Sequence, residues 1–205
     1  MSPGRAAARL CAGLFVAATG LPAPAADEPL KRILPPQDGA SLCFRRVYDE
    51  AHLKRLPGQQ TREALLAFRY RGDNGSHIES IQLMRRPPQP PLIFAGGCGW
   101  NPTSANIDTS GRRMIRSFTG KAGYDCIAVG APGSAEEGGY FLIDLAADGK
   151  SATLHLDSPI APWMGGRVGD HARHVDLSRD DRVFRLQRTE AAACAALQEE
   201  TRDAP

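Results

Sequence analysis

Two histidines and two carboxylates lie close together in the motif Asp170-His171-x-x-His174-x-Asp176. Imidazole nitrogens and carboxylate oxygens are common ligands of zinc and similar ions. On a strand, His174 and Asp176 would point to the same side, because side chains alternate between the two faces. His171, however, falls in a glycine-rich stretch, and the spacing defines no third ligand. We therefore predict no metal site and no cofactor. If a metal ion were bound here, His171, His174 and Asp176 would be its candidate ligands.

Hydrolysis would need a nucleophile beside a base. Ser134 and Ser158 fall in expected loops, and neither sits in a Gly-x-Ser-x-Gly turn. Glu136 and Glu137 are adjacent, and neighbouring residues on an extended chain face opposite ways, which separates their carboxylates. The sequence thus offers no catalytic constellation, and it favours a non-enzymatic role.

Two tryptophans stand out as candidates for a binding rim. Trp100 follows Cys98 and Gly99 in a glycine-rich stretch, and Trp163 lies in another. A tryptophan beside a disulfide at the rim of a barrel can form part of a ligand mouth or of a protein contact surface. The alternative is a hydrophobic plug packed on the disulfide. We favour the plug for Trp100 and keep Trp100 and Trp163 as the candidates for a binding rim.

The N-terminus has the three parts of a secretory signal peptide. Arg5 and Arg9 give a positive start, and residues 10–21 form an apolar run that is too short for a stable membrane anchor. Ala23-Pro24-Ala25 supplies the small residues that signal peptidase needs. We expect residues 1–25 to be a cleavable signal peptide. The product would be periplasmic or secreted, with no membrane span after cleavage.

The charge balance argues against nucleic-acid binding. Removal of residues 1–25 takes away two arginines and no acids, and leaves 23 basic and 23 acidic residues. A chain without net charge lacks the electrostatic attraction that nucleic acids require. The basic residues Arg112, Arg113 and Arg116 are expected to form a solvated face. The alternative is a contact for an anionic polymer such as a cell-wall glycan.

Four cysteines remain after cleavage, because Cys11 belongs to the signal. An even number of cysteines in an exported chain favours disulfides, here two with three possible connectivities. A four-thiolate zinc site is the alternative, but it usually needs close pairs, and these cysteines are scattered singly. We predict the pairs Cys43–Cys194 and Cys98–Cys126.

The elements that must position these residues are mostly short strands. Turn-forming residues recur every eight to twelve positions, a spacing typical of antiparallel barrels and sandwiches. We expect a mainly β fold: an antiparallel β-barrel or sandwich of about 8–10 short strands, with a short N-terminal helix over 50–56 and a C-terminal helix over 190–200. Residues 26–40 would be an extended lead-in, and 41–205 a single disulfide-bonded β-domain.

The clearest strand pair covers residues 140–145 and 151–156. Alternation places Leu154 and Leu156 in the core against Phe141 and Ile143, and turns His155 towards solvent. Residues 112–118 are expected to form another strand, and 174–177 to pair with 182–188. The helix that carries Cys194 should return over Cys43 and seal one end of the barrel.

The general shape, an exported disulfide-bearing β-domain, is similar to that of bacterial periplasmic inhibitors and lipocalin-like binders. This is a likeness of architecture, which does not fix function. We expect a non-enzymatic binding or inhibitor-like module for an unknown protein or small ligand of the cell envelope. The alternatives are an envelope hydrolase or metal-dependent enzyme, and a structural envelope protein.

Overall fold

A computed structural model describes residues 27–73, 75–103, 105–108, 110–120, 122–130, 138–165 and 173–204. Several sequence-based predictions fall outside these residues. They concern the signal peptide at 1–25 with its cleavage site, the metal-ligand candidate His171, and the polar residues Ser134, Glu136 and Glu137.

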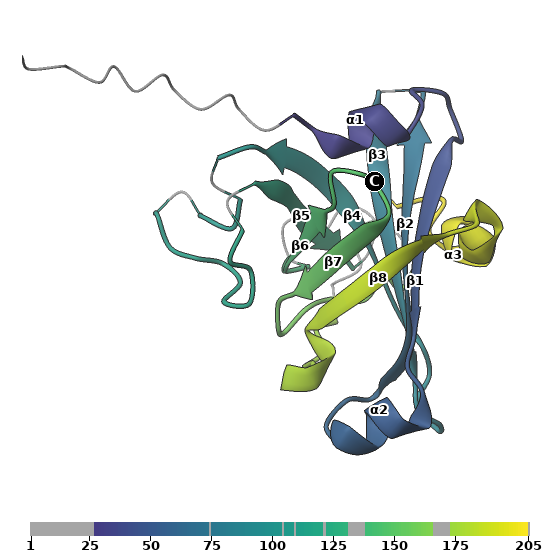
Figure 1. The fold of residues 1–205 in the computed structure, drawn as a ribbon, viewed down its shortest axis with the longest axis vertical. Helices are drawn as coiled ribbons and strands as arrows, with labels where there is room; N and C mark the ends of the chain where they lie inside the picture. Colours follow the sequence, from purple (N-terminus) through teal and green to yellow (C-terminus); the bar gives the residue numbers. More distant parts are fainter. Residues whose placement is uncertain are drawn as a thin grey trace, which may run out of the picture.

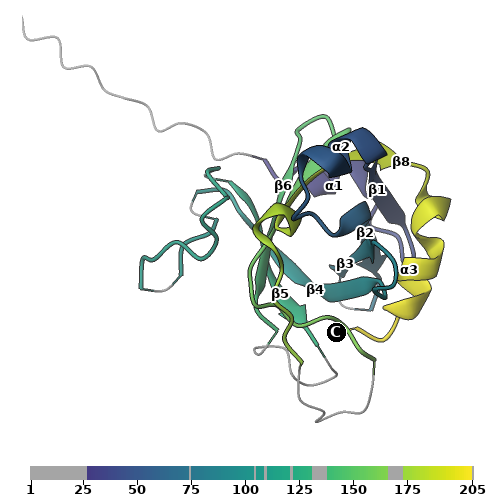
Figure 2. The ribbon, with the colours of Figure 1, turned by 90° about the horizontal axis from the view of Figure 1, so that it is seen from below.

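Eight antiparallel strands form one closed barrel, which is seen from the side in Figure 1 and along its axis in Figure 2. Each strand pairs with the next along the chain, and the last pairs with the first. This confirms the mainly β prediction and selects the barrel over the sandwich. The strands are β1 (Ser41–Val47), β2 (Thr61–Arg71), β3 (Ser76–Arg85), β4 (Leu92–Asn101), β5 (Gly123–Val129), β6 (Tyr140–Leu145), β7 (Ser151–Leu156) and β8 (Val183–Thr189).

Alternating apolar residues fill the barrel interior. Leu154 lies opposite Ile143, and Leu156 lies opposite Phe141, as the sequence predicted. All four side chains are buried, and aromatic residues from five other strands complete the packing: Phe44, Phe68, Phe94, Tyr124 and Phe184. The centre of the barrel is therefore a packed core, as expected for eight strands.

The C-terminal segment covers the outside of the barrel wall. After the 3₁₀-helix Ala191–Cys194, the helix α3 (Ala195–Glu200) packs Leu197 against Leu65 and Ala67 of β2. Both predicted disulfides, Cys43–Cys194 and Cys98–Cys126, are present. The first fastens this segment to β1. The expectation that it seals a barrel end is wrong, because α3 lies along the outer face of the wall (Figure 2).

Two other short helices lie at the two ends of the barrel (Figure 1). The helix α2 (Glu50–Arg55) begins at Asp49, whose side chain accepts a hydrogen bond from the backbone of His52. At the opposite end, α1 (Pro29–Ile33) lies within the 26–40 segment that was expected to be extended. Proline suits the first turn of a helix, and burial of Leu30 and Leu34 on the core holds this turn in place. No helix in the described part of the chain is both long and apolar enough to cross a membrane.

A long loop between β4 and β5 changes the environment of β6 and β7. Ile115 and Phe118 of this loop pack on the outward side chain of Leu142. The expected strand over 112–118 is absent from the described residues of this loop, where Arg113 makes only a single bridge with Ile107. His155 is consequently only 8% exposed, so the prediction that it faces solvent is wrong.

The segment before β8 also differs from the sequence-based expectation. Residues 174–177 were expected to pair with 182–188, but Val175 forms a single bridge with Ile160 instead. β8 pairs with β7 on one side and with β1 on the other. Both edges of β8 are thus occupied by the closure of the barrel, which leaves no edge for a further strand.

Candidate functional site at the barrel mouth

A buried carboxyl group lies on the inner face of β3, near the barrel end that α1 covers. Glu79 shares this face with Ile81 and Leu83 and is fully buried. Burial raises the pKa of Glu79, whereas its hydrogen bond to His77, the charge of His77 and nearby backbone N–H groups favour the ionised form. Its Oε2 atom has no hydrogen-bond partner among the described residues. Such a group is costly to bury.

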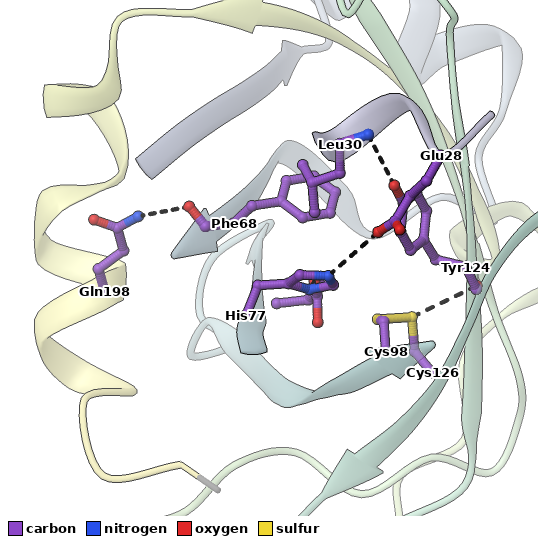
Figure 3. A network of polar contacts seen from close by, with 9 residues as sticks. Glu28, Leu30, Phe68, His77, Cys98, Tyr124, Cys126 and Gln198 are labelled. Carbon is purple, nitrogen blue, oxygen red and sulfur yellow. Dashed lines mark hydrogen bonds and ion pairs between the residues drawn. A yellow bond between two sulfur atoms is a disulfide. The ribbon is translucent and has the colours of Figure 1, made fainter. Parts of the chain in front are cut away.

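His77 joins this carboxyl group to a second one. Its Nδ1 atom contacts Oε1 of Glu79. Its Nε2 atom lies 3.9 Å from Oε1 of Glu28, a contact drawn in Figure 3. Burial alone would lower the pKa of His77, but the hydrogen bond to Glu79 and the charges of Glu79 and Glu28 outweigh it and raise the pKa. Both shifts favour keeping a proton between His77 and Glu79.

The helix α1 is held at this end of the barrel, which we call the mouth, by polar contacts as well as by its leucines. The backbone N–H of Leu30 donates to the hydroxyl of Tyr124 at 2.9 Å (Figure 3), and Glu28 Oε2 lies 3.1 Å from the ammonium of Lys31. Burial is the main cause that raises the pKa of Tyr124, so this hydroxyl stays protonated. Lys31, Glu28, His77 and Glu79 thus form a row in which basic and acidic groups alternate from the helix into the barrel.

Aromatic rings and a disulfide give this mouth a rigid floor. The ring of Tyr124 lies 5.0 Å from that of Trp100 and 6.0 Å from that of His77, measured between centroids. Cys98 and Cys126 face each other across β4 and β5 and join these strands beside the rings. Side chains held on paired strands and cross-linked in this way offer a pre-organised surface for a ligand.

A pocket of about 460 Å³ lies between α1 and the neighbouring strand ends, and it reaches this floor at His77 and Cys98. Its apolar walls include Leu30, Leu34 and Tyr70, and its polar groups include Glu28 and His77. A mainly apolar hollow with a few converging polar groups at the mouth of a β-barrel is a common form of small-ligand site.

The structure brings only one of the two candidate rim residues to this site. Trp100 lies at the mouth beside Tyr124. Trp163 is buried instead, where it packs on Val129 and donates its indole N–H to the carbonyl of Glu200 at 3.2 Å. It therefore forms no part of a rim.

The metal-ligand candidates do not converge within the described chain. His174 and Asp176 are both exposed, and His171 lies outside the described residues. Among the residues that the structure describes, no three histidine, cysteine or acidic side chains are grouped to hold a metal ion.

The mouth residues His77 and Glu79 were missed by the sequence analysis, although a signal for them exists. His77 and Glu79 lie at every second position before Ile81 and Leu83 on the same strand, so their side chains point inward as well. A charged residue on a core-facing position is unusual and often marks a functional site. Glu28 had no such signal, because its segment shows no periodicity.

A second polar arrangement lies outside the barrel, where the 105–118 loop covers β7. Oγ of Ser117 lies 3.0 Å from Nδ1 of His155. Burial, assisted by the charge of Arg185, lowers the pKa of His155 to about 4. A general base works best with a pKa near the working pH. The imidazole is therefore a weak base at neutral pH, and this pair is poorly suited to activate a serine nucleophile.

The same pKa shift predicts a specific sensitivity to acid. The unfolded chain takes up a proton at His155 near its ordinary pKa, about 6.5, whereas the folded protein does so only near pH 4. Stability should therefore fall as the pH drops from about 6.5 to 4, by about 1–3 kcal/mol from this residue after allowance for partial solvent screening.

Urea unfolding across this pH range tests the prediction by comparing the native chain with His155→Gln, which cannot titrate. The native chain should lose more stability in acid than the variant does. Parallel stability curves, or an imidazole resonance of His155 that titrates near its ordinary pKa, would contradict the prediction.

Comparisons with protein-family models, with curated proteins and with solved structures found no match to this chain. The fold itself defines the class of the protein: a closed, antiparallel eight-stranded barrel with two disulfides.

Proposed function

We propose that this chain is an exported, non-enzymatic binding module of the cell envelope that takes a small ligand in the mouth pocket beneath α1. The observation that carries the proposal is the buried pair of His77 and Glu79 behind an apolar pocket, where one carboxyl oxygen of Glu79 has no hydrogen-bond partner among the described residues. Proteins tolerate such costly polar groups mainly where function uses them. The ligand expected there has an apolar body and a polar group that reaches His77 and Glu28.

Two further observations support this proposal. The filled barrel interior limits a ligand to the mouth, where α1, the end of β2, the start of β3 and Cys98 already form a hollow. The two disulfides are compatible with an oxidising compartment outside the cytoplasm. The residues of the signal pattern remain the basis for expecting export and a mature chain that begins near Ala26.

A hydrolase is the less favoured alternative. It would rely on Ser117 and His155, and the lowered pKa of His155 argues against base catalysis at neutral pH. A structural envelope component would need no pocket with polar groups at its base.

The test uses protein purified from the exported fraction and the neutral fluorescent probe N-phenyl-1-naphthylamine. The purified chain should begin at or near Ala26, and the probe should brighten on binding. Tyr70→Ala removes a ring that lines the pocket and should weaken binding at least about tenfold, since an aromatic contact contributes roughly 0.5–1.5 kcal/mol beyond its buried area.

The matched control is Tyr140→Ala, which removes an exposed tyrosine from β6 and should leave binding unchanged. Failure of the chain to bind the probe, or equal effects of the two substitutions, would refute the mouth as the ligand site. Absence of the chain from the exported fraction would refute export, and a chain from that fraction that retained Met1 would refute cleavage near Ala26.

A further inference from the structure

A second hollow, which we call the arginine cleft, lies on the side of the molecule away from the mouth pocket. It has a volume of about 630 Å³ and is formed by three segments: the 114–117 loop, the end of β7 with Asp157, and residues 179–183. None of these segments takes part in the mouth pocket. A function of the cleft would therefore be independent of the proposed mouth ligand.

Positive charge dominates the arginine cleft. Three arginines line it, Arg116, Arg179 and Arg182, against the one carboxylate of Asp157. Arg116 and Arg179 are exposed at the surface of the protein. Guanidinium groups are the side chains best suited to bind carboxylate and phosphate, because their planar N–H donors match the geometry of these anions.

Arg182 is held in place by the protein itself. Its Nε and Nη2 atoms both donate to the carbonyl oxygen of Leu177, at 3.2 and 3.1 Å. A guanidinium has five N–H donors, so this contact fixes its position and leaves donors for a further acceptor. A pre-positioned cation loses less conformational freedom when an anion binds.

A hydroxyl group is also fixed at the cleft. Ser117 lines the cleft, and its Oγ lies 3.0 Å from Nδ1 of the buried His155. If Nδ1 carries the imidazole proton, it donates to Oγ, and the serine O–H remains free to donate to an anion. The imidazole itself stays uncharged at neutral pH, because its pKa is lowered to about 4.

The remaining walls of the cleft are apolar. Ile115, Leu156 and Val183 line it together with Met114. Val183 is 38% exposed, which is a large exposure for an apolar side chain on a strand that begins beside three cations. Ile115 and Leu156 are already buried by the protein, whereas Met114 is half-buried and Val183 is exposed. A free inorganic anion would use the arginines but leave Met114 and Val183 uncovered.

We propose that the arginine cleft binds a small organic anion. Its carboxylate or phosphate lies between Arg116, Arg179 and Arg182, and its apolar body covers Met114 and Val183. The size of the cleft fits a single dissolved molecule. A membrane surface would instead contact a broad, flat face.

Calorimetric titration of the full chain with decanoate tests this proposal. Decanoate should bind, whereas decyltrimethylammonium, with the same chain and the opposite charge, should not. Inorganic phosphate should bind at least about tenfold more weakly than decanoate. Vesicles that contain phosphatidylglycerol should not retain the protein.

Paired substitutions locate the binding. Arg116→Gln with Arg179→Gln should weaken decanoate binding at least about tenfold. Lys150→Gln with Arg188→Gln removes the same two charges at the opposite end of β7 and β8, where the backbones of these residues are hydrogen-bonded, and should leave binding unchanged.

Several outcomes would overturn the proposal: no binding of decanoate, equal loss in both double variants, or equal binding of decyltrimethylammonium. Phosphate binding as tight as decanoate would exclude a role for the apolar wall. Retention on vesicles without binding of decanoate would replace the dissolved anion by a lipid surface. Probe binding at the mouth should be the same in the two double variants, which separates this test from that of the mouth pocket.

Discussion

Removal of the Cys43–Cys194 disulfide by the double substitution Cys43→Ala, Cys194→Ala should lower the free energy of unfolding by about 5 kcal/mol. The two cysteines are 151 residues apart in the sequence, so the bond closes most of the described chain into one loop. In the chain-entropy account, a loop of this length restricts the unfolded state by about 5 kcal/mol. Many domains have a total stability of only about 5–15 kcal/mol.

Alanine is the better replacement because both cysteines are buried against apolar neighbours, including Leu65 and Leu197. A serine would add the separate cost of an unpaired buried hydroxyl. The native chain and the variant should be compared by urea unfolding, with α3 monitored through the solvent exchange of its amide protons. Those amides should exchange faster in the variant, since the disulfide fastens this segment to β1.

The second disulfide provides an internal comparison. Cys98 and Cys126 are only 28 residues apart and already face each other on paired strands. Their replacement by alanine should cost about 3–4 kcal/mol by the same account. If the short-loop pair cost as much as the long-loop pair or more, loop closure would not be the main source of stabilisation.

Local alternation was sufficient to predict much of the barrel. Apolar residues at every second position predicted the register of β6 with β7. Contacts between neighbouring strands depend on short stretches of sequence, so a single sequence records them well. The pairing of β8 with β1 joins opposite ends of the chain, and no local pattern encodes it.

His155 illustrates where alternation alone is insufficient. Its outward direction on β7 was predicted correctly, but the outer face of this strand is covered by the loop that carries Ile115 and Phe118. Alternation reports which face of the sheet a side chain joins. Whether that face meets solvent depends on distant segments. The same limit applies to α3, which was expected to seal an end and instead covers the wall.

The two candidate sites differ in how far the sequence could have revealed them. Side chains alternate along β3, so the assignment of Ile81 and Leu83 to the core would also have placed His77 and Glu79 inside the barrel. The arginine cleft could not have been found in this way. It combines Arg116 with Arg179 and Arg182, from segments that are far apart in the sequence and meet only when the barrel closes.

Leu154→Ala should lower the free energy of unfolding by about 2–5 kcal/mol, the range observed for large-to-small changes in a close-packed core. Leu154 is fully buried at the centre of the barrel, where it lies between Ile143 of β6 and Phe184 of β8. The substitution leaves a cavity that strands fixed on both sides cannot close, because each is hydrogen-bonded within a complete ring.

The adjacent substitution Thr153→Ala is the matched control. Thr153 points outward on the same strand, is partly exposed, and lies opposite Asp144 and Arg185. It should change stability by less than about 0.5 kcal/mol, as is usual for surface positions. Both variants should be unfolded in urea under the same conditions, with equal dependence on urea concentration as evidence that the unfolding transition is unchanged. Because a shift of register by one residue exchanges the two faces of a strand, equal losses, or a larger loss for Thr153→Ala, would mean that β7 is paired in the wrong register.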